Sequence, residues 1–304
     1  MSKTKKIIIA VSGICMALGL VICICALALS GDIFGVMNMN SIKFEKSTYE
    51  IAESFESINI SEIDSDVKLL PSKDGKCKIE ATESKSIYNK ITVENGELKI
   101  TRVDARRWYE RIQFGFFGNV SLTVYLPQSE YSALTLKTVS GDITLPSGFA
   151  FESARVSSTS GEIDIYSDVK GSLDVSSTSG SIDIKGVNSV SDVSIKTVSG
   201  EIALESASAA NLTVSSTSGG VYVKDTLAKG NFYAKTVSGR IKLERFDAAS
   251  LEIRSTSGGV YCELLSEKNV SAKSTSGSIS APENVNGAPC KITTVSGNIK
   301  VIFP

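Results

Sequence analysis

Residues 195–204 read IKTVSGEIAL, and this order of strand, glycine and strand decides the fold. Apolar residues alternate along both arms, from Ile195 before the glycine to Ile202 and Leu204 after it. Alternation of period two predicts β-strands with one buried face. Counted from Gly200, the inward side chains lie at odd-numbered positions before the glycine and at even-numbered positions after it. A single regular strand keeps the same parity throughout, so it cannot continue through Gly200. Gly200 therefore predicts a bend at which a positive φ or crowding excludes a Cβ atom.

The same motif, Thr-Val-Ser-Gly or Ser-Thr-Ser-Gly, occurs nine times at intervals of 19 or 20 residues, with apolar residues at positions −7, −5, +2 and +4 from its glycine. This period is too short for a repeat of paired helices. We therefore predict an all-β protein, a single-chain parallel β-helix or β-solenoid with 19–20-residue coils, whose nine repeats occupy residues 131–304. The predicted structural corners are Gly141, Gly161, Gly180, Gly200, Gly219, Gly239, Gly258, Gly277 and Gly297.

Hydroxyl groups accompany every corner. Position −1 is serine in all nine repeats, and position −3 is serine or threonine in all nine. Both share the inward parity, so we expect hydroxyl ladders under the corner that bond to neighbouring coils. The chain ends at Pro304, directly after the ninth repeat, and an open end there predicts end-to-end self-association.

The N-terminal residues predict a membrane anchor. Residues 7–29 carry no charge, and a helix of that length would be roughly 34 Å long. The hydrocarbon core of a bilayer is about 30 Å thick. Three lysines precede the segment, so the positive-inside rule makes residues 1–6 a cytoplasmic tail and 7–29 a transmembrane helix. The expected localisation is a single-pass cell-membrane protein with an extracellular C-terminal domain, and a signal peptide cleaved near residues 26–28 is the alternative.

Between the anchor and the repeats, residues 30–50 predict a linker, and residues 51–130 predict degenerate coils that cap the stack. An insertion at 102–119 is rich in arginine and aromatic residues, which are enriched in binding hot spots. It either plugs the open core or contacts a membrane protein or lipid surface. The candidate partner-binding residues are Arg106, Arg107, Trp108, Tyr109, Phe114, Phe116 and Phe117.

The composition excludes several classes of function. The chain has no histidine, which removes Ser-His-Asp triads, Cys-His pairs and histidine zinc sites. Its 32 basic and 33 acidic residues give no basic footprint for nucleic acid. Outside the apolar N-terminal segment only Cys77, Cys262 and Cys290 remain, an odd and scattered set that predicts no disulfide framework. We expect no catalytic residue, no cofactor and no metal.

The outward positions +1 and +3 line one face of the predicted solenoid. In the first coils they are acidic, and Asp164 and Asp183 would stand about 4.8 Å apart on adjacent coils. This half could be a solvated face, the beginning of a calcium site with Glu162, or a carboxylate pair for polysaccharide cleavage. Later coils place basic and aromatic residues on the same face, ending with Lys300. The candidate glycan-binding residues there are Tyr222, Arg240, Lys242 and Tyr261.

The phrase LTVYLP at residues 122–127 and the tandem repeats of the TVSGDI type resemble the bacterial "putative adhesin" family of unknown function, which is widespread among Gram-positive envelope proteins. The resemblance covers roughly residues 40–304. It implies a right-handed parallel β-helix-like fold outside the membrane, and some family members resemble accessory proteins of envelope-stress systems. The family offers no catalytic residues to carry over.

These patterns together predict a non-enzymatic extracytoplasmic scaffold or regulatory protein of the bacterial cell envelope, associated with envelope stress, that contacts a membrane-protein partner through the 102–119 insertion. The alternative is a surface adhesin that binds glycan or wall polymer through its long face. A polysaccharide-cleaving β-helix enzyme that depends on Asp164 is a minor alternative.

Overall fold

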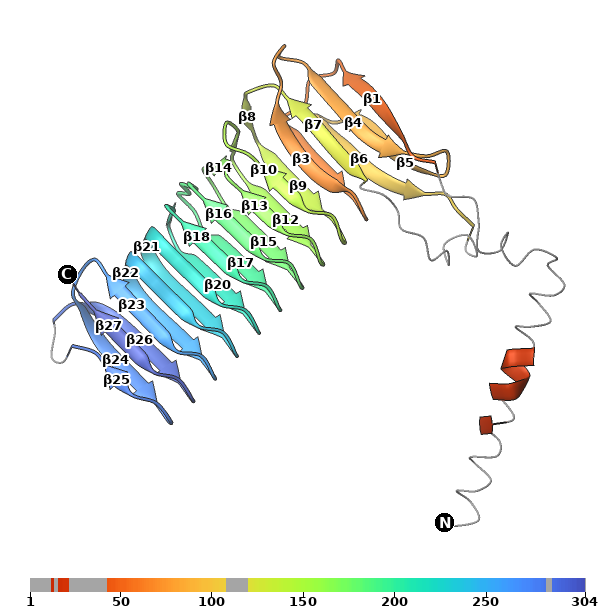
Figure 1. Ribbon diagram of the computed structural model, residues 1–304. Helices are drawn as coiled ribbons and strands as arrows, with labels where there is room; N and C mark the ends of the chain where they lie inside the picture. Colours follow the sequence, from red (N-terminus) through yellow and green to blue (C-terminus); the bar gives the residue numbers. More distant parts are fainter. Residues whose placement is uncertain (1–11, 14–15, 22–42, 108–119, 283–285, 304) are drawn as a thin grey trace. The chain divides into compact units, whose positions relative to one another are not determined.

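The computed structural model describes residues 12–13, 16–21, 43–107, 120–282 and 286–303. The chain divides into two compact units, of which the larger comprises Phe44–Ala105 and Gly118–Pro304. This unit is a stack of β-coils, and each coil adds strands in parallel beside those of its neighbour (Figure 1). The predicted all-β solenoid is confirmed.

The strands that precede the glycines form one wall of the stack. They pair in parallel and in register, so that Leu173 lies opposite Val193, and Val193 lies opposite Leu212. In-register pairing follows from the fixed repeat length, because each residue meets its equivalent one coil away. This wall contains β9 (Ala133–Lys137), β12 (Ala154–Ser158), β15 (Leu173–Ser177), β17 (Val193–Thr197) and β20 (Leu212–Ser216).

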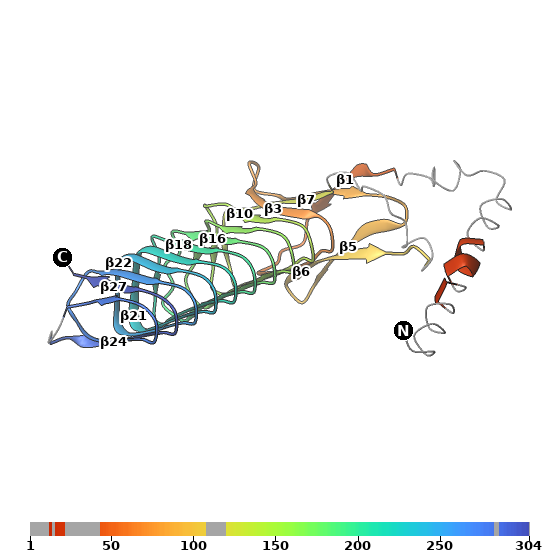
Figure 2. The same cartoon turned by 60° about the horizontal axis from the view of Figure 1, so that its bottom comes forward.

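The strands that follow the glycines form a second wall, and Figure 2 shows the coils as a series of loops around a common interior. This wall contains β10 (Ile143–Leu145), β13 (Ile163–Ile165), β16 (Ile182–Lys185) and β18 (Ile202–Glu205). In later coils one strand runs from this wall into the first wall of the next coil, as in β21 (Val221–Thr236) and β22 (Ile241–Ser255). Three two-residue strands form a short third sheet, β8 (Glu130–Tyr131), β11 (Ala150–Phe151) and β14 (Asp168–Val169).

The interior is filled by the side chains at the predicted inward positions. Ile195, Val214 and Ile202 have no exposed surface, and the rings of Phe232 and Phe246 lie 4.4 Å apart across adjacent coils. All coils built from the nine repeats bury these positions except the one formed by residues 268–281. Burial of aliphatic side chains on every coil supplies the main stabilisation of the stack, at about 25 cal/mol per Å² of apolar surface.

At the corners, the backbones of neighbouring coils come too close for a side chain. A Cβ atom on Gly200 would lie 2.0 Å from the carbonyl oxygen of Gly180, and one on Gly219 would lie 1.6 Å from the carbonyl oxygen of Gly200. The same clash recurs at all nine corners, within 2.2 Å in every case. None of the nine has a positive φ. Crowding by the adjacent coil, rather than backbone conformation, therefore requires glycine here.

The hydroxyls at position −3 lie under the corner, as the parity predicts. Ser216 Oγ accepts a hydrogen bond from the Gly219 amide at 2.8 Å and donates to the Gly200 carbonyl of the adjacent coil at 3.3 Å. The serines at position −1 are instead exposed, so their predicted inward placement is wrong. The chain already turns outward two residues before the glycine. The position −1 serines instead donate hydrogen bonds from their backbone amides to the neighbouring coil, as Ser218 does to the Val198 carbonyl at 2.8 Å.

The C-terminal coils do not stack in sequence order. The last coil pairs with β22 and β23 on one side and with β24 and β25 on the other. It therefore lies inside the stack, and residues 268–281 form the end coil. The end coil leaves Ile279 exposed and Val270, Ala272 and Ala281 only partly buried, whereas the inserted coil fully buries larger side chains such as Ile292. Placing the coil with two alanines at the end leaves less apolar surface in water. The strands concerned are β23 (Val260–Leu264), β24 (Lys268–Ser274), β25 (Ile279–Ser280), β26 (Ala288–Thr294) and β27 (Ile299–Ile302).

At the N-terminal end, two irregular coils precede the repeats. β2 (Ser57–Ser61) and β3 (Asp66–Pro71) pair in parallel with β9 and β10. β6 (Glu97–Asp104) and β7 (Ser121–Leu126) then pair in parallel with β2 and β3. Antiparallel pairing then ends the series of parallel coils. The antiparallel strands are β1 (Glu45–Ile51), β4 (Cys77–Glu83) and β5 (Ile87–Glu94).

The predicted membrane anchor and the localisation derived from it are wrong. Within the described ranges, no helix is both long enough and apolar enough to cross a bilayer. Of residues 7–29, the structure describes 12–13 and 16–21, which are helical. The rest of that segment lies outside the described residues.

Crowding at the corner predicts that alanine substitution has a large effect on stability at one glycine and almost none at its neighbour. A Cβ on Gly258 would lie 1.6 Å from the Gly239 carbonyl oxygen, whereas the nearest atom to a Cβ on Gly259 is 3.4 Å away. We expect Gly258→Ala to lower the free energy of unfolding by about 3 kcal/mol, because the coils must separate. Gly259→Ala should change it by less than about 0.5 kcal/mol. Urea denaturation followed by circular dichroism measures both, and equal midpoints would contradict the crowding argument.

Candidate functional site

Aromatic and basic side chains alternate across four adjacent strands near the C-terminal end. Tyr222 on β21 lies opposite Lys242 on β22, Lys242 lies opposite Tyr261 on β23, and Tyr261 lies opposite Lys300 on β27. We call these four residues the Tyr–Lys ladder. Because in-register strands point equivalent side chains the same way, the four groups project from one wall at intervals of about 4.8 Å.

Contacts within the ladder hold the side chains against the wall. The Lys300 ammonium lies 5.8 Å from the centre of the Tyr261 ring, in range of a cation–π interaction. Lys242 forms an ion pair with Glu244 at 2.6 Å on the same strand. The ring of Tyr222 lies close to the backbone of Gly220, where a Cβ atom would meet the ring at 2.6 Å. The two tyrosines are therefore placed about 9.6 Å apart, two strand intervals, with a cation between them.

The Tyr–Lys ladder borders a depression of about 640 Å³, which we call the ladder depression. Arg240, Lys242 and Lys300 line it, and Glu244 is the one carboxylate among its lining residues. Gly259 leaves its floor without a side chain, and Asn298 adds an exposed amide. The depression thus combines an aromatic face, an excess of positive charge and neutral hydrogen-bonding groups.

The structure brings together three of the four predicted glycan-binding residues in this depression: Arg240, Lys242 and Tyr261. Tyr222 lies beside them in the ladder. In the sequence, the repeat of Gly277 lies between the repeats that carry Tyr261 and Lys300. The sequence therefore offers no reason to expect that these two residues lie directly opposite each other. Asn298 was missed for the same reason, because the coil that carries it is inserted next to β23.

The N-terminal half of the same wall is acidic. Asp164 lies directly opposite Asp183, and burial together with the negative charges of Asp183 and Asp142 raises the pKa of Asp164. Burial and the same kind of repulsion raise the pKa of Glu162. Among the residues that the structure describes, no three carboxylate or thiol side chains converge in a way that could hold a metal ion. The calcium site beginning at these residues is therefore not supported by the geometry.

Repulsion along this acidic row predicts that removing one charge stabilises the protein. Asp164→Asn should raise the free energy of unfolding at pH 7 by about 0.2–1 kcal/mol, because it relieves like charges on directly opposed residues. The gain should disappear at low pH, where protonation removes the same charge. Asp174→Asn is the matched control, since Asp174 forms an ion pair with Arg155 at 3.5 Å. A loss of stability in Asp164→Asn would contradict the prediction.

The predicted partner-binding insertion falls mostly outside the described part of the chain. Trp108, Tyr109, Phe114, Phe116 and Phe117 lie outside the described residues. Arg106 is half-buried and Arg107 is exposed. Their role in partner binding stays a prediction.

A buried ion pair lies where the chain leaves the stack toward this insertion. Glu62 and Arg102 directly follow Ser61 and Thr101 in the two irregular coils, at the position that the −3 hydroxyl has in later coils. Arg102 Nε lies 3.9 Å from Glu62 Oε2 and 3.5 Å from Asp64 Oδ1, and both Glu62 and Arg102 side chains are almost fully buried. Arg102 also donates a hydrogen bond to the Thr82 carbonyl at 3.0 Å. A charged pair thus replaces the hydroxyl ladder where the corner is interrupted.

The environment of Glu62 makes stability depend on pH. Burial raises its pKa from 4.5 to about 7, and the attraction of Arg102 opposes this only in part. The folded state holds this proton more tightly than the unfolded chain, so stability falls as the pH rises from 4.5 to about 7. The loss is about 2–3 kcal/mol for this residue. Glu62→Gln should remove that part of the dependence, and urea denaturation across this pH range measures it. Parallel curves for the two proteins would show that Glu62 keeps an ordinary pKa.

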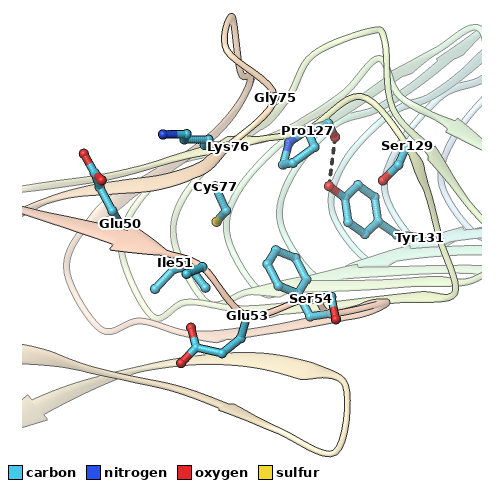
Figure 3. A pocket seen from close by; sticks show the side chains of 12 residues that line it. Glu50, Ile51, Glu53, Ser54, Gly75, Lys76, Cys77, Pro127, Ser129 and Tyr131 are labelled. Atoms are coloured by element: carbon cyan, nitrogen blue, oxygen red, sulfur yellow. Dashed lines mark hydrogen bonds between the residues drawn. The ribbon is translucent and has the colours of Figure 1, made fainter.

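The N-terminal end also contains a recess of about 530 Å³ (Figure 3). Phe55 and Tyr131 stack across it with ring centres 6.1 Å apart, and Cys77 lies at its base. The Tyr131 hydroxyl donates to the Pro127 carbonyl at 2.8 Å, and burial raises the pKa of Cys77 to about 12. Tyrosine and thiol are therefore neutral and the hydroxyl is already bonded. Glu50, Glu53 and Lys76 also line the recess, so it combines apolar and charged groups.

The fold defines a β-solenoid protein, and the ladder depression lies on one of its walls. The chain belongs to the Toastrack DUF4097 family, whose model matches residues 55–301. The resemblance to bacterial proteins described as putative adhesins is thereby confirmed. None of the curated proteins compared with the chain matches it significantly.

Solved structures share this fold at low sequence identity. A protein described as a putative adhesin from Parabacteroides merdae is 13% identical, with a TM-score of 0.57 over 86% of this chain and 96% of its own. A putative adhesin from Parabacteroides distasonis is 14% identical, with a TM-score of 0.57 over 86% and 98%. A putative lipid-binding protein from the same organism is 19% identical, with a TM-score of 0.56 over 85% and 97%. These similarities establish the fold.

Proposed function

We propose that this chain is a non-catalytic binding protein that holds an anionic glycan or wall polymer along the Tyr–Lys ladder. The observation that carries the proposal is the alternation of tyrosine and lysine on four in-register strands beside an open, positively charged depression. The similarity to structures described as adhesins supports a binding role of this kind.

The chemistry of the ladder suits a charged sugar chain. A tyrosine ring offers a flat apolar face for the C–H groups of a sugar, and its hydroxyl offers a hydrogen bond to sugar hydroxyls. Lysine and arginine supply charge-assisted hydrogen bonds to carboxylate, sulfate or phosphate groups. A repeating polymer can satisfy both demands along successive strands, whereas a small neutral ligand would offer no counter-charge to Arg240 and Lys300.

The geometry favours binding over polysaccharide cleavage. Glycoside hydrolysis needs two carboxyl groups on opposite sides of the scissile bond. Asp164 and Asp183 stand on adjacent in-register strands, so their side chains project in the same direction from one wall. The raised pKa of Asp164 then reflects its burial first and the crowding of like charges second.

The scaffold or regulatory function in the cell envelope depends on residues 102–119, most of which lie outside the described residues. It stays a prediction, and the ladder supports the glycan-binding alternative instead.

Substitution of the tyrosines tests the proposal. Tyr222→Ala and Tyr261→Ala should each weaken binding to a linear polyuronate such as polygalacturonate about tenfold, equivalent to about 1.4 kcal/mol, because each removes one sugar-stacking surface. Isothermal titration calorimetry measures the affinity. Tyr88→Ala is the matched control, because Tyr88 is 39% exposed on the N-terminal strand β5. Unchanged affinity in both ladder variants would refute the proposal.

A further inference from the structure

A second basic depression lies on the other wall of the same coils. It has a volume of about 550 Å³, and its lining includes Lys235, Arg254, Lys273 and Lys291. Hydroxyl side chains complete the lining, among them Thr256, Thr275 and Thr293. We call this feature the rear depression. None of its lining residues carries a carboxylate.

The register explains why these cations gather. Lys235 on β21 lies opposite Arg254 on β22, and Arg254 lies opposite Thr293 on β26, which in turn lies opposite Lys273 on β24. Lys291 belongs to the inserted coil on β26, between β22 and β24. Four adjacent strands therefore contribute one cation each, and the coil insertion puts the cation of β26 among the others.

Only part of this positive charge is neutralised. Glu252 accepts hydrogen bonds from Arg254 at 2.6 and 2.9 Å, and Lys291 lies 3.9 Å from the same carboxylate oxygen. Lys235 and Lys273 form no ion pair with any residue in the described part of the chain. Like charges held close on adjacent strands cost stability unless a counter-charge binds. The rear depression therefore favours an anion from outside the chain.

The two depressions meet at one corner of the solenoid. Thr275 lines the rear depression and Ser276 lines the ladder depression, and Val295 and Ser296 divide in the same way. These corner residues are exposed, small and uncharged. No bulky or acidic side chain of the corner motif stands between the two sites.

We propose that the two depressions form one continuous site for a linear anionic polysaccharide that crosses the corner of the last coils. This inference rests on the function proposed above and extends it from one wall to two. The ladder depression binds sugar rings and charges, and the rear depression binds charges alone. The acidic row that begins at Asp142 and continues to Asp183 on the ladder wall repels a polyanion running along the stack, so the chain has to turn around the corner instead.

The lysines of the rear depression provide the test. We would compare wild type with Lys273→Gln/Lys291→Gln, using full-length chain and two probes, long heparin and a heparin tetrasaccharide. Lys137→Gln/Lys196→Gln is the matched control, because those lysines occupy the −4 position on the same wall outside both depressions. Circular dichroism verifies that each variant is folded, and fluorescence anisotropy in increasing NaCl gives affinity and its salt dependence.

The expected result separates the two walls. Lys273→Gln/Lys291→Gln should bind long heparin about tenfold more weakly, with a log–log salt slope smaller by about 1–2, because two ionic contacts are lost. Its affinity for the tetrasaccharide should match wild type, since that probe needs only the ladder depression. Equal effects of the control pair and the rear pair would overturn the inference, because charge alone would then explain binding.

Two further outcomes separate this inference from the function on which it rests. If Tyr261→Ala weakens both probes while the rear pair changes neither, the proposed function stands and the second wall is not part of the site. If Tyr261→Ala changes neither probe, the proposed function fails and this inference fails with it. Single-stranded DNA of the same length that binds as tightly as heparin would overturn the assignment to a polysaccharide.

Discussion

Neighbouring coils can approach to the distance of a backbone hydrogen bond only where no Cβ atom stands between them. At each corner the carbonyl oxygen of one coil occupies the place where the next coil would carry a side chain. The glycine therefore fixes the distance between coils. The hydroxyl three residues earlier then bonds to the glycine amide, as Ser177 does at Gly180, and in several coils it also reaches the preceding carbonyl. The in-register walls and the continuous aliphatic core both depend on that close contact.

In-register stacking also explains how such a protein can carry a binding site without any loop designed for it. Each outward position repeats at the strand interval, so the residues at one position of successive coils form a row of side chains along a wall. The same column holds Asp164 and Asp183 in early coils and Tyr222, Lys242 and Tyr261 in later ones. Opposite net charges on one wall would confine the proposed anionic ligand to the C-terminal coils, because the fold keeps the two halves at a fixed distance.

The coils depart from the regular repeat near both ends of the stack. At the N-terminal end Glu62 and Arg102 replace the hydroxyl ladder, which places charges in a buried position and raises the pKa of Glu62 to about 7. At the C-terminal end the last coil enters the stack and leaves an alanine-containing coil at the end. The two departures have different causes. The end coil at the C-terminal side lacks a neighbour on one side, whereas Glu62 and Arg102 lie beside strands that are paired on both sides, where the corner is interrupted.

The sequence by itself determined the coil. Period-two apolar arms, a glycine at every change of parity and a repeat of 19 or 20 residues allow one local structure, and the apolar residues that face inward followed directly from it. The wall that carries Tyr222, Arg240, Lys242 and Tyr261 followed as well, since parity assigns each side chain to a face. Two things needed the tertiary structure. The order of the coils depends on which apolar side chains gain most from burial, and only that order sets Lys300 beside Tyr261 and Lys291 beside Glu252. The outward turn of the position −1 serines depends on the path of the corner, which parity along a straight strand does not describe.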